Sequence, residues 1–226
     1  MNRFLYKFFL VCLLIVSTTR PSIAQPFSGD IAAFKKQDSV SFPPKKAILF
    51  IGSSSFTMWK DVNEYFPGYK IINRGFGGST FPDVIRYTDD ILFPYEPRQV
   101  VIYCGENDLA FSDTVTATTV FQRFEKLFSM IRNRLPKSSI VYVSIKPSPS
   151  RENLLPKMRE ANGLIRNFLK KKKRTAFVDV YPEMINDEGK PRPELFIADK
   201  LHMNKEGYLI WQKAIKPYLL NIKYKK

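Results

Sequence analysis

The segment ADKLHMN, residues 198–204, contains His202, the only histidine in the 226-residue chain, with Asp199 three residues before it. A histidine beside a carboxylate is a candidate proton carrier, because the carboxylate can fix the imidazole tautomer and stabilise the imidazolium. An Asp-x-x-His pair alone is usually incidental. The pair gains chemical meaning only if another part of the chain supplies a group that the imidazole can activate.

Three polar clusters could supply that group: GSSSFT (52–57), NRGFGGST (73–80) and GENDLA (105–110). Ser54 stands at a predicted strand-to-helix corner, where its hydroxyl is exposed and the helix start offers N–H groups to an anion. The glycines of the second cluster let the backbone approach a ligand closely. Asn107 in the third is a neutral donor for an oxyanion. A serine needs a base to attack a carbonyl, and the intermediate needs fixed donors, so these parts predict acyl transfer.

Five short runs, rich in β-branched and apolar residues, must position these clusters. They are KAILFIG (46–52), YKIINRG (69–75), RQVVIYCG (98–105), SIVYVSI (139–145) and TAFVDV (175–180). Continuous apolar runs suit strands that are buried on both faces of a parallel sheet. The polar clusters fall just past the predicted strand ends, which is the edge where open α/β sheets bind ligands.

Apolar residues recur at helical spacing in three other segments. These segments span 112–135, 158–169 and 208–219. Ser112 or Asp113 is the expected N-cap of the first, and Pro217 should kink or shorten the last. The alternation of strands and helices predicts a three-layer α/β/α sandwich with about five mostly parallel strands.

In chain order, GSSS, GFGGS, GEND and DKLH resemble the four sequence blocks of the SGNH hydrolases, also called the GDSL esterase/lipase superfamily. The resemblance implies a flavodoxin-like sandwich in which Ser54 is the nucleophile and Asp199 and His202 complete a triad. It also implies an oxyanion hole made by the Ser54 N–H, the Gly78 N–H and the Asn107 side chain.

This likeness covers the chain from about residue 46 to the last predicted helix, and it departs from the family at one position. Ser53 stands where the family's G-D-S signature has aspartate. That aspartate is not the triad acid, so the change bears on the lipase-like subgroup more than on catalysis. GSSS together with NRGFGGS and the late GYLIW resembles an exported bacterial acylhydrolase subset of the family.

Other residues near these clusters have two interpretations each. Arg151 follows the fourth predicted strand and is a candidate contact for an acidic or hydroxylated substrate, or a plain surface arginine. Trp59 and Phe81 are candidates for the wall of an acyl pocket, or for the core. One of Glu106 and Asp108 is expected to cap or brace the loop that carries the oxyanion-hole amide.

Residues 1–24 have the layout of a secretory signal peptide, with a charged start, an apolar run and small residues before Gln25, so cleavage is expected after Ala24. The apolar run is shorter than the ~20 residues of a membrane span, which predicts export rather than a stable membrane anchor. Residues 25–226 are expected to form one domain, with 26–45 as a short helix and a proline-containing lead-in. The destination is the periplasm or the exterior, and the oligomeric state is left open.

After removal of the signal, Cys104 is the only cysteine. It lies in an apolar strand and is expected to be a small buried hydrophobe rather than a nucleophile. A single cysteine forms no internal disulfide, and with a single histidine it makes a zinc site improbable. We therefore expect no metal and no cofactor.

The charge after removal of three signal Lys/Arg is 33 − 21 = +12, much of it in KKKKR (170–174) and KYKK (223–226). No aromatic residues interleave with the lysine run as nucleic-acid binding requires, so a solvated surface is the expected explanation.

The sequence thus predicts a serine esterase that deacylates a small ester on a carbohydrate or lipid-like substrate. Two alternatives remain: a non-catalytic module that binds an anionic glycan, and a transacylase that uses the same triad.

Overall fold

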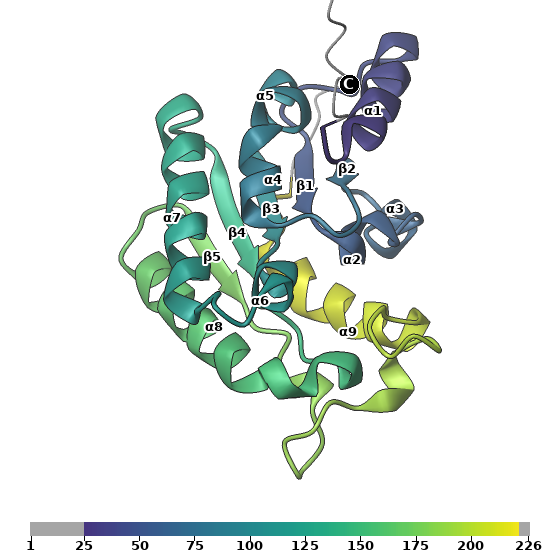
Figure 1. The fold of residues 1–226 in the computed structure, drawn as a ribbon. Helices are drawn as coiled ribbons and strands as arrows, with labels where there is room; N and C mark the ends of the chain where they lie inside the picture. The colour runs from purple at the N-terminus through teal and green to yellow at the C-terminus, as the bar shows by residue number, and fades with distance from the viewer. Residues whose placement is uncertain (1–24, 222–226) are drawn as a thin grey trace, which may run out of the picture.

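A five-stranded sheet in the order β2-β1-β3-β4-β5 forms the centre of the molecule (Figure 1). The computed structural model describes residues 25–221, so the predicted signal peptide lies outside the described residues. The strands are β1 (Ile48–Gly52), β2 (Ile71–Gly75), β3 (Gln99–Tyr103), β4 (Ser139–Val143) and β5 (Thr175–Val178). All four pairings are parallel, which confirms the predicted sheet.

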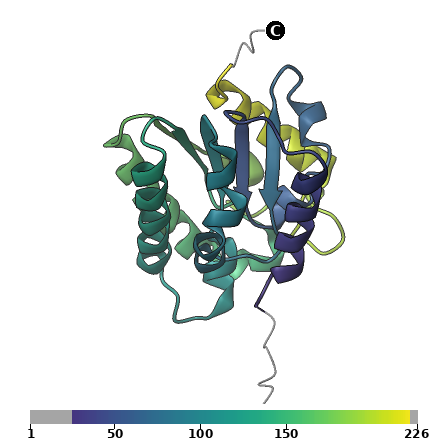
Figure 2. The same cartoon turned by 90° about the horizontal axis from the view of Figure 1, so that it is seen from above.

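Helices cover both faces of this sheet, and Figures 1 and 2 show the resulting three layers. The α-helices are α1 (Ser28–Val40), α2 (Ser54–Thr57), α3 (Val62–Tyr65), α4 (Phe81–Arg86), α5 (Thr88–Ile91), α6 (Glu106–Phe111), α7 (Ala117–Arg134), α8 (Leu155–Lys170) and α9 (Lys205–Ile215). Short 3-10 helices are η1 (Phe93–Tyr95), η2 (Pro149–Leu154), η3 (Pro182–Met184), η4 (Pro193–Leu195) and η5 (Lys216–Tyr218). Within residues 25–221, no helix is long and apolar enough to cross a membrane.

Two hydrophobic cores, one on each face, explain why the strands are apolar throughout. Along β1, Leu49 and Ile51 belong to the core shared with α1, α4, α5, α7 and α8. Ile48 and Phe50 point the other way, into the core shared with α2, α3 and α9. Each of these side chains is fully buried, and burial of one such group stabilises the fold by about 1.5–3 kcal/mol.

The helix that was predicted over 112–135 begins later than expected, and the N-caps assigned to Ser112 and Asp113 are wrong. Thr116 is the N-cap of α7, because its hydroxyl accepts the Thr119 N–H at 3.1 Å. The Ser112 hydroxyl instead bonds Thr114 within the preceding turn. The last helix, α9, ends at Ile215, and the chain continues as η5, as expected from the proline at position 217.

The predicted lead-in contains α1, which a buried ion pair fastens to the edge of the sheet. Arg74 on β2 lies 2.5 Å from the Asp38 carboxylate, and the Tyr95 hydroxyl donates to the same carboxylate at 2.5 Å. The guanidinium also lies over the Phe34 ring. Lead-in and sheet are therefore packed together through side chains that water barely reaches.

Gly52 decides how β1 ends and where the serine cluster begins. Its φ of +132° lies in a region that side chains rarely adopt, and a Cβ there would stand 1.8 Å from the Tyr103 carbonyl oxygen. The neighbouring backbone of β3 cannot move away, because it is hydrogen-bonded into the sheet. Only glycine therefore fits directly before Ser53.

Replacing Gly52 by alanine should strongly destabilise the protein, because the added Cβ clashes with the Tyr103 carbonyl. We expect the melting temperature to fall by more than ~10 °C, or the variant to be insoluble. Gly163→Ala in α8 is the matched control, since a Cβ there meets nothing within 4 Å and alanine favours a helix by about 0.5–1 kcal/mol. Thermal unfolding followed by circular dichroism measures both. Equal melting temperatures for the two variants would contradict the steric explanation.

Candidate active site

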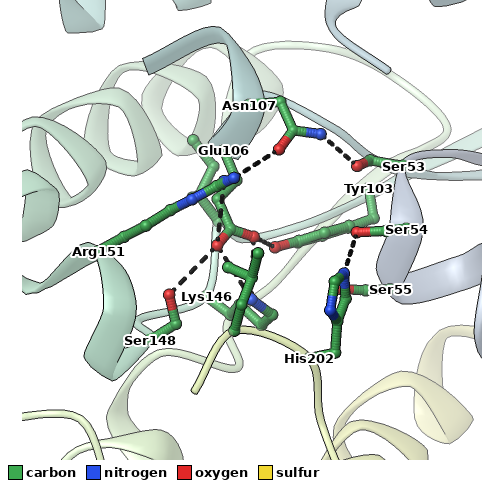
Figure 3. Close-up of polar contacts among 12 residues, drawn as sticks. Ser53, Ser54, Ser55, Tyr103, Glu106, Asn107, Lys146, Ser148, Arg151 and His202 are labelled. Carbon is green, nitrogen blue, oxygen red and sulfur yellow. Dashed lines mark hydrogen bonds and ion pairs between the residues drawn. The ribbon is translucent and has the colours of Figure 1, made fainter. Parts of the chain in front are cut away.

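Segments that are far apart in the sequence meet at the carboxyl edge of the sheet. Ser54 is the first residue of α2, directly after β1. Asn107 lies in the first turn of α6, four residues beyond Tyr103, the last residue of β3. Asp199 and His202 lie in the loop before α9. Figure 3 shows His202 facing Ser54 and Asn107 facing the neighbouring Ser53.

A chain of two hydrogen bonds links serine, histidine and aspartate. The Ser54 Oγ lies 2.9 Å from His202 Nε2, and His202 Nδ1 lies 2.6 Å from Asp199 Oδ2. An ionised carboxylate only accepts hydrogen bonds, so Nδ1 carries the proton and a neutral ring leaves Nε2 free to accept from the Ser54 hydroxyl. This is the arrangement in which imidazole can act as a base toward serine.

Asp199 holds both the imidazole and the loop that carries it. While Oδ2 faces the ring, Oδ1 accepts the backbone N–H groups of Leu201 and His202, each at 2.9 Å. The loop then closes through the N–H of Ile197, which donates to the His202 carbonyl at 2.9 Å. One carboxylate therefore sets the backbone and the ring of the histidine together.

These contacts keep Asp199 ionised. Desolvation raises the pKa of this carboxyl, but the hydrogen bonds from the backbone and ring of His202 and from the Leu201 N–H outweigh it and lower the pKa from its ordinary 3.8 to about 2. Asp199 is therefore a charged acceptor at any pH above about 3.

Asn107 presents its amide to the serine cluster in one orientation. Its Nδ2 donates to Ser53 Oγ at 2.7 Å and to the Ser79 carbonyl at 3.0 Å. On the other side, Arg151 Nη2 donates to Asn107 Oδ1 at 2.9 Å. Both N–H groups of the amide thus point toward the loops that follow β1 and β2.

Two backbone N–H groups complete the predicted set of donors. Ser54 occupies the first position of α2, where an N–H has no acceptor within its own helix. Gly78 lies in the turn before α4 with a φ of +80°, and its N–H donates to no acceptor within residues 25–221. A Cβ placed on the adjacent Gly77 would lie 3.9 Å from the Ser54 Cβ, so this turn passes close to the serine.

Behind Asn107 lies a buried cluster of charges, drawn in Figure 3. Lys146 Nζ is 3.0 Å from both oxygens of Glu106, and Arg151 Nη1 is 3.4 Å from Glu106 Oε1. The Tyr103 hydroxyl donates a short hydrogen bond to Glu106, and Ser148 Oγ donates to it at 3.4 Å. Sequence reasoning considered Arg151 and Glu106 but missed Lys146 and Tyr103. A lysine at the end of an apolar strand, in SIKPSPS, was the available signal.

Burial shifts the pKa values of Glu106 and Lys146 in opposite directions. Desolvation raises the pKa of Glu106, but the charges of Lys146 and Arg151 and the hydrogen bond from Tyr103 outweigh it, so its pKa is lowered. Desolvation lowers the pKa of Lys146, and the Glu106 carboxylate opposes this. Glu106 is consequently the anion that keeps two cations together in the interior.

Asp108 also braces this region, so both acids that flank Asn107 do so where one was expected. It is fully buried, accepts the Phe81 N–H at 3.0 Å and pairs with Arg123 at 2.8 Å. These contacts tie α6 to the start of α4 and to the second turn of α7.

Trp59, Phe81 and Cys104 belong to the interior. The Trp59 indole is 0% exposed and packs against aromatic rings that include Tyr208, at 4.8 Å, so the expectation that it contacts a substrate does not agree with its position. Phe81 is likewise fully buried. Cys104 is buried and free, and desolvation raises its pKa well above the ordinary value, as expected for a hydrophobe rather than a nucleophile.

Comparison with known proteins identifies the family to which the chain belongs. Residues 50–210, more than half of the chain, match the model of the GDSL-like Lipase/Acylhydrolase family. The chain belongs to the GDSL-like lipase/acylhydrolase family. It is therefore a hydrolase of esters, with the α/β/α sandwich that its sequence predicts.

Individual relatives span most of the chain. Human platelet-activating factor acetylhydrolase IB subunit alpha1 is 25% identical over 213 residues, which cover 90% of this chain and 90% of that protein. A GDSL-like lipase from Bacteroides thetaiotaomicron has a TM-score of 0.69 at 22% identity, covering 83% of this chain and 95% of the other. An acetylxylan esterase from Geobacillus stearothermophilus has a TM-score of 0.61 at 16% identity, covering 81% and 99%. The two structures support the fold.

Metal ligands were not expected, and within the described part of the chain no three or more His, Cys, Asp or Glu side chains are grouped to hold a metal ion.

The tautomer of His202 can be read directly, because it is the only histidine of the chain. In untagged protein labelled with ¹⁵N, we expect the neutral form of the imidazole to carry its proton on Nδ1 and to leave Nε2 unprotonated, owing to the bond to Asp199. Two-bond ¹H–¹⁵N correlation spectra measure this. A neutral ring protonated at Nε2 would contradict the geometry.

The lowered pKa of Asp199 also predicts a dependence of stability on pH. Since the pKa is about 2 in the folded chain and about 3.8 unfolded, the ionised group stabilises the fold above pH ~4, and this contribution is lost as the pH falls toward ~2. In Asp199→Asn, an amide oxygen can still accept the two backbone N–H groups. The difference in free energy of unfolding between wild type and variant should therefore shrink between pH ~5 and ~2 in urea titrations. A difference that stays constant over this range would count against the shift.

Proposed function

We propose that this protein is a serine esterase that removes a short acyl group, with Ser54 as nucleophile, His202 as base and Asp199 as the acid of the triad. The observation that carries the proposal is the continuous hydrogen-bonded chain from Ser54 through His202 to Asp199, at 2.9 and 2.6 Å. Ser54 and His202 lie 148 residues apart, so only the fold brings them together. Because the chain belongs to a family of ester hydrolases, the contact has a chemical purpose, namely activation of Ser54 for attack on an ester.

Ser54 begins the reaction by attacking the ester carbonyl carbon while its proton passes to His202 Nε2. The carbonyl oxygen becomes an oxyanion, and the imidazolium is stabilised by Asp199. Collapse of the intermediate breaks the bond to the leaving alkoxide, which takes the proton from Nε2. Water then attacks the acyl-serine by the same route, so the products are a carboxylic acid and an alcohol and the enzyme is restored.

The oxyanion is expected to be held by the N–H groups of Ser54 and Gly78 and by Asn107 Nδ2. Each donor of this kind contributes about 2.7–4 kcal/mol to lowering the barrier in comparable sites. Both N–H groups of Asn107 are occupied in the resting site, by Ser53 and Ser79. The oxyanion would therefore displace the Ser53 hydroxyl from Asn107 Nδ2, or share this donor with it. In the resting site, the Ser53 hydroxyl occupies the position of the developing negative charge.

Acetyl or another short acyl group is the proposed substrate part, attached to a carbohydrate or to a small lipid-like alcohol. Support comes from relatives described as an acetylhydrolase and an acetylxylan esterase, which together include both kinds of leaving group. The sequence adds the absence of a long apolar insertion of the kind that covers the site of a micelle-acting lipase.

Hydrolysis is favoured over transfer to another alcohol by the exposure of the site. The side chains of His202 and Asp199 are 21% and 43% exposed, so water reaches the base without a rearrangement. A transacylase would have to keep water from the same position. A glycan-binding module without catalysis would have no use for the Ser54–His202 hydrogen bond.

We also propose that residues 25–226 act as one catalytic domain that is exported after cleavage behind Ala24, to the periplasm or the exterior. The pairing of Asp38 on α1 with Arg74 on β2 supports including the lead-in within that domain. The comparison of periplasmic, secreted and cytoplasmic fractions from a native host tests the export.

Ser54→Ala should lower the kcat for p-nitrophenyl acetate by at least ~10³-fold with unchanged folding, because the acyl acceptor is lost. Ser39→Ala is the matched control, since this exposed hydroxyl bonds only its own helix, and it should keep full activity. The turnover that remains in Ser54→Ala measures cleavage of this activated ester by surface lysines. Turnover in Ser54→Ala equal to that of the control would contradict the proposal.

A further inference from the structure

The buried cluster of Glu106, Lys146 and Arg151 lies directly behind the amide proposed to bind the oxyanion. Lys146 is 1% exposed and Glu106 6%, and their charged atoms are 3.0 Å apart. This pair neutralises itself. Arg151 then adds a second cation, with Nη1 3.4 Å from Glu106 and Nη2 2.9 Å from Asn107 Oδ1. The cluster therefore carries one positive charge in excess, and that charge faces Asn107.

Such an arrangement is costly for the fold alone. Burying a cation loses hydration, and a buried ion pair is weak evidence for stability. Moreover, Arg151 Nη1 is shielded from solvent and makes no hydrogen bond within the described residues, although Glu106 lies within ion-pair distance. The hydrogen bond from Arg151 Nη2 to Asn107 is the contact that offsets part of this loss of hydration.

That hydrogen bond fixes the direction of the Asn107 amide. If the amide turned over, its oxygen would face the Ser79 carbonyl, which is also an acceptor, and its NH₂ would face the guanidinium, which is also a donor. Only the observed orientation satisfies both sides. It is also the orientation that points Nδ2 at the serine cluster.

The same bond strengthens the donor. A guanidinium on Oδ1 draws electron density toward the oxygen and makes the Nδ2–H groups more positive, an effect that is larger in a poorly hydrated interior. We propose that Arg151 is a positioning residue, which acts on the reaction through Asn107 by orienting and polarising its amide, and that Glu106 and Lys146 hold Arg151 in place. This inference rests on the proposed function of Asn107 as an oxyanion donor.

The position of Arg151 thus favours a different role from the substrate contact expected from sequence. Its side chain is 17% exposed, and both terminal nitrogens are directed at groups of the protein. The nitrogen that is not bonded to Asn107, Nη1, is shielded from solvent, so an acidic substrate would not reach it in this arrangement.

A double-mutant cycle on p-nitrophenyl acetate, a neutral ester, separates the two roles. Arg151→Ala should lower kcat by ~10–100-fold with KM changed less than ~2-fold, and Asn107→Ala should lower kcat by ~10²–10³-fold. The double variant should be no slower than Asn107→Ala alone, within ~3-fold, because Arg151 has nothing left to act on. Arg134→Ala, which removes a surface arginine paired with Asp89, is the control for loss of charge and should keep full activity.

Two conservative variants guard against a misfolded Arg151→Ala protein. Arg151→Gln keeps a donor for Asn107 Oδ1 without the charge, and Arg151→Lys keeps the charge without the planar fork. Both should fold, as circular dichroism would verify. With Asn107 present, both should have a higher kcat than Arg151→Ala. When either is combined with Asn107→Ala, the kcat should be no higher than that of Asn107→Ala alone.

Additive losses in the cycle, or an effect of Arg151→Ala confined to KM, would overturn the positioning role. Neither result would affect the esterase proposal as long as turnover still requires Ser54. If turnover were independent of Ser54, the proposed function itself would fail, and the cycle would show no dependence on either Asn107 or Arg151.

Discussion

The hydrogen bond between the Asp199 carboxylate and His202 Nδ1 is the contact on which the chemistry of this site depends. It places the ring proton on Nδ1 and thereby leaves Nε2 to accept from Ser54. The same carboxylate folds the loop by accepting two backbone N–H groups, so the ring cannot be oriented independently of the chain. Because its pKa is about 2, the acceptor stays charged wherever the protein is folded near neutral pH.

The parallel sheet positions the groups that lie opposite the Asp199–His202 pair. The carboxyl ends of parallel strands lie at one edge, so the segments after β1, β2 and β3 bring a serine, a glycine turn and an amide to the same place. Gly52 lets β1 end against Tyr103, and the next residue, Ser53, lies within hydrogen-bond reach of Asn107. On the far side of that amide, a buried excess of positive charge complements the negative charge that develops on an ester oxygen.

The strands and the position of the site could be predicted from the sequence, because both depend on local patterns of apolar and polar residues. Apolar runs predicted all five strands, and polar residues just past them predicted the edge where Ser54 and His202 meet. What could not be predicted depends on contacts between distant segments. The N-cap of α7 is decided by a competing turn at Ser112, and Trp59 is drawn into the core by rings from α9. The two cations that pair with Glu106, Lys146 and Arg151, come from a segment some 40 residues later, and no sequence spacing predicts this contact.

The most direct test of the central claim is covalent labelling with a fluorophosphonate followed by peptide mass spectrometry. The phosphonate bonds to an activated serine and so reports nucleophilicity without depending on the natural substrate. We expect one adduct per chain, on the peptide that contains Ser54, and a labelling rate at least ~10²-fold lower in His202→Ala. An adduct on another residue, or equal labelling of the His202→Ala protein, would contradict activation of Ser54 by His202.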